Sequence, residues 1–244
     1  MLDYQLLFGA DSIVYKNAIS LPFWQKPAFL LFWSDSATLP ASFLGVTFIV
    51  ALYVLISKST FRLAFFILWF CIVNINNNVY TTLSAGDFLL QHLLFFSIFL
   101  SDSSVKSTPF KSGLDISFHN AGIIALRLQV CIVYFYAAYA KLLDTDWMNG
   151  TAISTTLSVH EYSLPVFYHS HSIIGKILDY LVIAYQLLFP ALVWIRKIKK
   201  WYLLAGVLQH LFIALVIGLP SFGLIMIVAY TIFYAPGSKT QKTF

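Results

Sequence analysis

Charge is the feature that this sequence has least of. Only 10% of its 244 residues are Asp, Glu, Lys or Arg, whereas 59% are hydrophobic and 18% are aromatic. An ordinary soluble domain carries about 25% charged residues. So small a charged fraction is expected when most of the surface faces lipid instead of water. The composition therefore predicts an all-α, polytopic transmembrane helix bundle, which is a fold class that excludes a soluble enzyme.

Cysteine and the common catalytic signatures are also scarce. Cys71 and Cys131 fall within apolar stretches, so neither a disulfide framework nor a zinc cluster is implied, and both are expected to pack as small buried residues. The sequence has no Gly-rich phosphate loop and no GxSxG motif. His169 and His171 would point the same way in an extended backbone, but no third ligand accompanies them, so no metal site is assigned.

Apolar runs recur along the chain, and about seven of them are expected to cross a membrane. Residues 1–40 are mixed, and their aromatic stretches predict an external N-terminal segment with a helix lying at the membrane interface. A transmembrane domain is predicted over 41–235, followed by a cytoplasmic tail over 236–244. The predicted spans are 41–57, 61–75, 85–101, 120–143, 173–194, 201–217 and 221–235, with polar loops at 102–119 and 144–172.

The basic residues assign an orientation, because cytoplasmic loops accumulate Lys and Arg. Only Lys16 and Lys26 lie outside if the turn at 58–62 is inside. Loop 144–172 is then external, whereas 195–200 and the C-terminus are cytoplasmic. This scheme leaves the N-terminal segment outside without a preceding span to carry it there. The inside segments would hold Lys58, Arg62, Lys106, Lys111, Arg196, Lys197, Lys199, Lys200, Lys239 and Lys242. This distribution needs no nucleic-acid partner to explain it.

Polar side chains within the spans, and a few residues at their ends, are the candidate functional residues, because polar groups are costly in lipid and by default mark a function. Arg127, Tyr134 and Lys141 are spaced by seven, so they share one helix face. His210 lies near the middle of its span. The predicted catalytic residues are Lys141 and His210, and the predicted substrate-binding residues are Asn78, Asp87, His92, Arg127, Tyr134, Trp147 and Asp179.

Structural explanations stay open beside these functional ones. Lys141 could pair with Asp87 or Asp179 only to satisfy a buried charge. The segment from Asp144 to Trp147 could bind a cation or a substrate amine. It could equally form an interfacial turn that Gly150 ends.

Several stretches resemble one known family. The run YFYAAYAKLLDTDWMNGTA, which begins at Tyr134, resembles the HTTM membrane domain that vitamin K-dependent gamma-glutamyl carboxylases share with many bacterial multi-span proteins. Further likeness lies in the asparagines 76–78, in the Gly-Asp pair at 86–87, in His210 and in 222–230. The resemblance covers about residues 60–235.

This resemblance implies a helix bundle, but it argues against glutamate carboxylation. The carboxylases use a lysine as base toward a reduced quinone. Lys141 matches the first of their two adjacent lysines, but Leu142 stands at the second, on which they depend. Asn78 stands where they have a histidine. Leu cannot replace an amine in proton transfer. A quinone is therefore a cofactor suggested by the resemblance alone.

Two functions follow from these observations. In the first, the protein modifies, or assists the maturation or export of, a peptide or lipid-soluble substrate at the outer face, and it resembles the membrane component of peptide-toxin maturation systems. Its partners would be the lipid bilayer and a small peptide or partner membrane protein. In the second, it is a non-enzymatic transporter or the membrane subunit of a larger complex. A purely structural assembly partner is a third reading.

Overall fold

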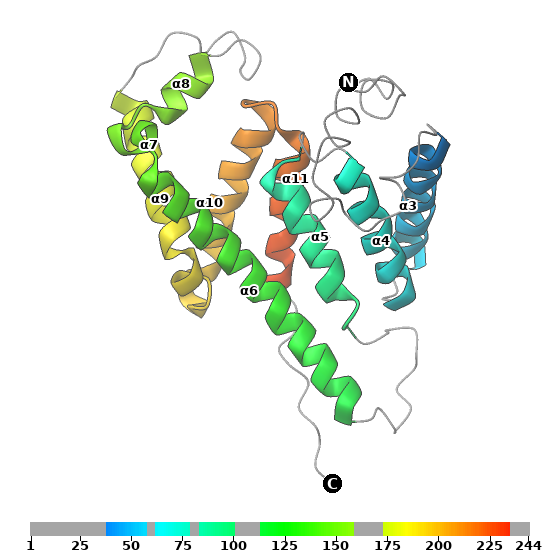
Figure 1. The fold of residues 1–244 in the computed structure, drawn as a ribbon. Coiled ribbons are helices and arrows are strands. Elements are labelled where there is room, and N and C mark those ends of the chain that lie inside the picture. The colour runs from blue at the N-terminus through cyan, green and yellow to red at the C-terminus, as the bar shows by residue number, and fades with distance from the viewer. Residues whose placement is uncertain (1–37, 58–61, 79–82, 101–112, 159–172, 235–244) are drawn as a thin grey trace. The chain divides into compact units, whose positions relative to one another are not determined.

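The computed structural model describes residues 38–57, 62–78, 83–100, 113–158 and 173–234, and these ranges contain helices and no strand (Figure 1). The α-helices are α3 (Thr38–Ser57), α4 (Arg62–Asn78), α5 (Ala85–Ser97), α6 (Gly113–Leu143), α7 (Thr145–Asn149), α8 (Ala152–Ser158), α9 (Ile173–Leu192), α10 (Arg196–Leu215) and α11 (Pro220–Ala229). A 3₁₀-helix, η5 (Tyr230–Phe233), follows α11 directly.

The chain divides into two compact units, which are described separately. The first contains Met1–Ala125 with Gly237–Phe244, and the second contains Leu126–Pro236. The boundary falls within α6, so the long helix contributes its first part to one unit and its second part to the other.

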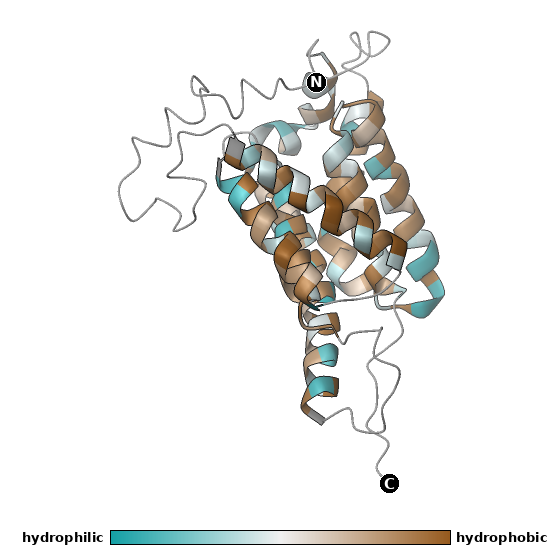
Figure 2. Cartoon of the chain, turned by 90° about the vertical axis from the view of Figure 1, so that its right-hand side faces the viewer, coloured by the Kyte–Doolittle hydropathy of each residue, from teal (hydrophilic) through white to brown (hydrophobic). Residues whose placement is uncertain are grey.

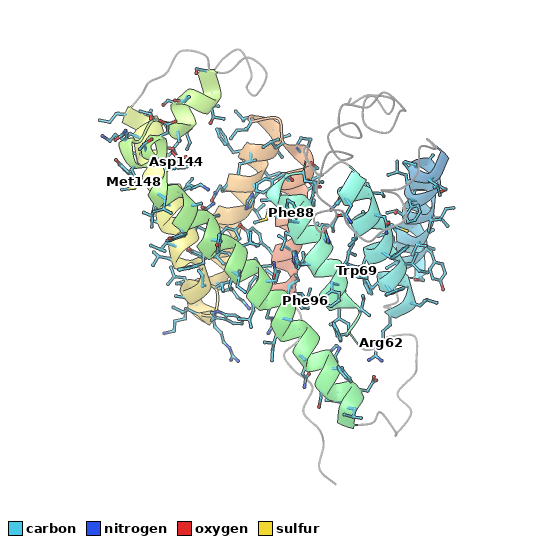
Figure 3. All side chains as sticks on the ribbon, viewed as in Figure 1. Arg62, Trp69, Phe88, Phe96, Asp144 and Met148 are labelled. Atoms are coloured by element: carbon cyan, nitrogen blue, oxygen red, sulfur yellow. The ribbon has the colours of Figure 1, made fainter. Side chains whose placement is uncertain are left out.

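In the first unit, α4 packs against both α3 and α5. Four of its buried residues recur at helical spacing along one face, namely Ala64, Leu68, Cys71 and Ile75. Near the end of the helix, Val73, Asn74 and Asn76 are buried as well. Arg62, labelled in Figure 3, begins this helix. Its guanidinium donates to the Leu100 carbonyl oxygen at 3.1 Å and pairs with the Asp115 carboxylate at 2.5 Å. One arginine therefore joins the start of α4 to the residues that follow α5 and to the first turn of α6.

In the second unit, α10 packs on α11, and α7 and α8 lie beside α9. Gly223 permits the close contact between α10 and α11, because a Cβ there would lie 2.6 Å from the His210 carbonyl oxygen and 2.8 Å from the Ala214 Cβ. The buried face of α9 includes two polar residues, Asp179 and Gln186, among apolar ones.

Three described helices are long and apolar enough to cross a membrane: Leu39–Ser57, Leu114–Leu143 and Ile173–Leu192. Two shorter helices, Arg62–Asn77 and Pro220–Phe233, are also apolar. The helices are mostly coloured as hydrophobic in Figure 2, with hydrophilic residues interspersed. In α3, Phe48 is 69% exposed and Leu55 is 73% exposed, as expected of side chains that face lipid. These findings confirm an all-helical membrane protein. Among the described residues, three helices are long enough for a full crossing, and the seven predicted spans stay a prediction.

Several predicted boundaries are wrong. The polar loop expected at 102–119 ends by Gly113, where α6 begins, because Asp115 and its polar neighbours continue the helix. The loop expected at 144–172 contains α7 and α8, and the predicted inner segment 195–200 includes the first turn of α10. The interfacial helix expected in 1–40, and the pair His169 and His171, lie outside the described residues.

Candidate functional site

Two of the predicted site residues, Tyr134 and His210, meet in the interior of the second unit. Tyr134 lies on α6 and His210 on α10, and each is only 1% exposed. The Tyr134 hydroxyl oxygen lies 2.6 Å from His210 Nε2, which is a hydrogen bond between side chains 76 residues apart. This contact brings a phenol and an imidazole together inside a bundle of apolar helices.

The hydrogen bond is part of a longer chain of hydroxyl groups. The Tyr134 hydroxyl also hydrogen-bonds to the hydroxyl of Tyr230 in η5. The Tyr230 hydroxyl lies 3.3 Å from that of Tyr185 on α9. Tyr185 in turn donates to the backbone carbonyl of Tyr202 at 3.2 Å, and the Tyr202 hydroxyl donates to the Tyr185 carbonyl at 2.5 Å. We call Tyr134, Tyr185, Tyr202, His210 and Tyr230 the tyrosine–histidine cluster.

Aromatic packing encloses these polar groups. Phe189 stacks on Tyr134 with ring centroids 4.0 Å apart and lies 5.9 Å from the ring of Tyr230. Tyr185 and Tyr202 stack at 4.6 Å. Such packing contributes apolar contact area and lowers the local dielectric, which strengthens hydrogen bonds that are satisfied and makes unpaired polar atoms costly.

Gly206 provides the room that the hydroxyl chain needs. A Cβ at this position on α10 would overlap the hydroxyl groups of both Tyr185 and Tyr230. Any larger residue would force at least one of these rings to move. The cluster therefore depends on the glycine at position 206 as well as on its tyrosines.

Lys141, the other predicted catalytic residue, lies at the end of α6. Its ammonium nitrogen is 4.7 Å from the centroid of the Trp147 ring and 3.5 Å from the Ala137 carbonyl oxygen. A cation over an indole face is an attractive pair, and it brings together two of the predicted site residues. Lys141 does not pair with Asp179 in the described structure, although the two residues belong to the same unit.

The segment after Lys141 forms the structural turn that the sequence offered as an alternative. Asp144, labelled in Figure 3, caps α7 by accepting hydrogen bonds from the N–H groups of Asp146 and Trp147. Gly150 ends the helix in a left-handed conformation with φ of 73°. These residues position Trp147 beneath the Lys141 ammonium group.

Asp179 is fully buried and holds the beginning of α8. Its Oδ1 accepts a hydrogen bond from the Ile153 N–H at 3.1 Å, whereas Oδ2 has no partner among the described residues. Gln186 Oε1 and His210 Nδ1 are likewise buried without a described partner. Buried polar atoms normally find partners, so each of these orphans requires an explanation.

The remaining predicted site residues lie elsewhere. Arg127 donates to the Ile232 carbonyl oxygen at 3.3 Å in the second unit. In the first unit, Asp87 forms a capping box with Ser84 at the start of α5, and His92 is exposed with Nδ1 2.6 Å from the Phe88 carbonyl oxygen. Asn78 is the last residue of α4, and its side chain is outside the described structure.

The sequence did not single out three members of the cluster, namely Tyr185, Tyr202 and Tyr230. The chain has 14 tyrosines, and an isolated tyrosine in an apolar helix gives no sign of its partner. The spacing of Tyr185 and Phe189, four residues apart, indicates a shared helix face and was the one available signal.

The geometry and composition define a helical membrane protein with a polar cluster enclosed in one unit. The HTTM domain family model matches residues 42–237, so the chain belongs to the HTTM domain family. The "Sporulation-delaying protein SdpB" of Bacillus subtilis (strain 168) is 31% identical over 120 residues, which cover 46% of this chain and 36% of that relative. The "Uncharacterized protein YitO" of the same organism is 28% identical over 127 residues, covering 47% of this chain and 40% of that protein.

The matched region is therefore less than half of either Bacillus relative. No solved structure matches this chain.

Proposed function

We propose that this chain is a multi-pass membrane protein whose tyrosine–histidine cluster, together with Lys141, forms an intramembrane site. At this site it modifies, or assists the maturation or export of, a peptide or lipid-soluble substrate. The site faces the outer side of the membrane. The carboxylation of glutamate is not part of this proposal, because Leu142 stands where the carboxylases need a lysine.

The observation that carries the proposal is the buried hydrogen bond between Tyr134 and His210. Placing an imidazole and several phenols in an apolar bundle costs free energy unless every polar atom is satisfied. A cluster needed only for stability is more simply built from apolar side chains of similar volume. Imidazole and phenol groups can both donate and accept protons, which suits them to acid–base work or to binding a polar substrate group.

Lys141 supports the same proposal from the end of α6. It belongs to the same unit as the cluster, and Trp147 shields one side of its ammonium group. A cation held in this way can attract a carboxylate or a peptide C-terminus.

The test is to express the full chain together with candidate small secreted peptides and to analyse the secreted peptides by mass spectrometry. His210→Ala and Lys141→Ala are compared with the matched control Lys197→Ala, which replaces an exposed lysine at the start of α10. We expect the first two variants to abolish a mass change or the secretion of one peptide, while the control retains both.

The outcomes separate the alternatives. Loss of the mass change identifies a modifying enzyme. Loss of secretion with an unaltered peptide identifies the transporter or transport subunit. If His210→Ala and Lys141→Ala lower only the thermal stability and leave every peptide unaffected, the protein is a structural partner and the proposal is wrong.

A further inference from the structure

The hydroxyl chain of the cluster has a direction, and its fixed end is the backbone carbonyl of Tyr202. A carbonyl oxygen accepts hydrogen bonds but cannot donate one. The hydroxyl of Tyr185, 3.2 Å away, must therefore be the donor in that contact. A phenol has only one proton, so Tyr185 can act only as an acceptor toward its other neighbour.

The same reasoning passes along the chain one residue at a time. Because Tyr185 accepts, Tyr230 must donate across the 3.3 Å contact between their hydroxyls. Tyr230 has then used its proton, so Tyr134 donates to Tyr230. Tyr134 has then used its own proton, and the 2.6 Å contact with His210 requires a donor on the histidine. That donor is Nε2–H.

This polarity determines what the other ring nitrogen can do. A neutral imidazole carries a proton on one nitrogen and a lone pair on the other. With the proton on Nε2, Nδ1 is an acceptor, and it is buried with no partner among the described residues. No described carboxylate hydrogen-bonds to the ring, and a doubly protonated ring buried without one would be costly. If every hydrogen bond in the chain ran the other way, Tyr185 would donate to Tyr230. The lone pairs of the Tyr185 hydroxyl oxygen and the Tyr202 carbonyl oxygen would then face each other with no proton between them.

We propose that the cluster holds His210 in the Nε2–H tautomer and that Nδ1 accepts a hydrogen bond from a hydroxyl or N–H group of the substrate. This inference rests on the proposed function only for the identity of its ligand, because the tautomer exists whatever the protein does. Tyr134, Tyr230 and Tyr185 are then positioning residues, which act on the substrate through the histidine.

The tautomer is measured on the full chain labelled with ¹⁵N-histidine in lipid nanodiscs. His210→Gln assigns the His210 signals by their loss, and the unsubstituted protein is expected to show a protonated Nε2 and an unprotonated Nδ1. A proton on Nδ1 in that protein would overturn the proposal. The tautomer is read from the unsubstituted protein, so His210→Gln is the one variant that has to fold for this measurement.

Two variants test how the tautomer is fixed. Tyr185→Phe removes the hydroxyl that donates to the Tyr202 carbonyl, so Tyr230 and Tyr134 can reverse and a population protonated at Nδ1 is expected to appear. Tyr202→Phe is the matched control, because among the described residues its hydroxyl donates to the Tyr185 carbonyl alone and lies outside the directed chain. It should leave the tautomer unchanged. Equal effects of the two variants would contradict the proposed direction.

The ligand is tested with two probes of similar shape, phenol and anisole, of which only phenol has a hydroxyl donor. Phenol is expected to shift the Nδ1 signal of His210, whereas anisole is not. No response to phenol, or the same response to both, would show that Nδ1 is not a site for a donor group. If the tautomer and the phenol response are found but no peptide is altered, the proposed function fails and this inference stands.

Discussion

At the scale of single residues, Gly206 is the position where the smallest change has the largest expected effect. A methyl group there would overlap the hydroxyls of Tyr185 and Tyr230. We expect Gly206→Ala to lower the stability by about 1–3 kcal/mol, as overpacking of a close-packed interior does. Thermal unfolding in detergent measures it. Gly45→Ala is the matched control, because it meets nothing within 4 Å and should be neutral or slightly stabilising.

A double variant identifies the cause. Tyr185→Phe removes one of the two hydroxyls that the new methyl group would meet. Tyr185→Phe should therefore lower the stability less in the Gly206→Ala background than it does in the unsubstituted protein. Strictly additive losses would indicate that Gly206→Ala acts somewhere other than at these hydroxyls.

The sequence points to two of the five members of the tyrosine–histidine cluster and does not predict their contact. Tyr134 stands out because it shares a helix face with Arg127 and Lys141, and His210 because it lies near the middle of its span. Their contact joins residues 76 positions apart, and helical periodicity carries no information about which helices pack together. Lys141 and Trp147 are only six positions apart, but their contact depends on the turn that Asp144 begins.

At the scale of elements, the start of α5 tests the predicted role of Asp87. Ser84 and Asp87 cap this helix reciprocally, so Ser84→Ala is expected to cost about 0.5–2 kcal/mol. Asp87→Ala should cost a similar amount, and the double variant little more than either single one. Thermal unfolding of the three variants is the measurement.

The same variants show whether Asp87 also binds substrate. If it acts only as a cap, Ser84→Ala and Asp87→Ala will reduce function by the same factor at equal loss of stability. A much larger functional loss in Asp87→Ala would establish the predicted binding role. A stability loss in Asp87→Ala alone would contradict the reciprocal cap.

Helices were predicted best where apolar residues are continuous. The predicted span at 173–194 corresponds to α9, and the one at 41–57 to α3. The errors fall where helices contain polar residues. The first five residues of α10 include Arg196, Lys197, Lys199 and Lys200, which hydropathy assigns to a loop although the backbone is helical. Helices as short as α7 and α8 are set by caps such as Asp144, and hydropathy averaged over a span cannot detect them.

At the scale of the whole molecule, the predicted orientation can be measured by cysteine labelling. Ser158 in α8 and Lys197 in α10 are both exposed and are predicted to lie on opposite sides of the membrane. A membrane-impermeant maleimide should label Ser158→Cys in intact cells, and Lys197→Cys only after permeabilisation. The native Cys71 and Cys131 are buried and provide a low background. The reverse pattern would invert the topology and place loop 144–172 in the cytosol.

The class of the molecule followed from composition alone, because 10% charged residues leave few arrangements other than helices in lipid. The number of membrane spans does not follow from composition. α5 has 13 residues and α11 has 10, so length does not decide whether such a helix crosses a membrane or packs within the bundle. The division of α6 between two units has no counterpart in the sequence pattern, because the helix is continuous across it.

Arg62 has a consequence for the connectivity of the first unit. Its guanidinium contacts Leu100 and Asp115, which flank residues 101–112, so the two ends of that connection are tied by a side chain as well as by the backbone. The entropy of closing a loop grows only logarithmically with its length. After an insertion between 101 and 112, whether evolved or introduced as a tag, the contacts of Arg62 with Leu100 and Asp115 are therefore expected to keep these flanking residues at the same distance from each other.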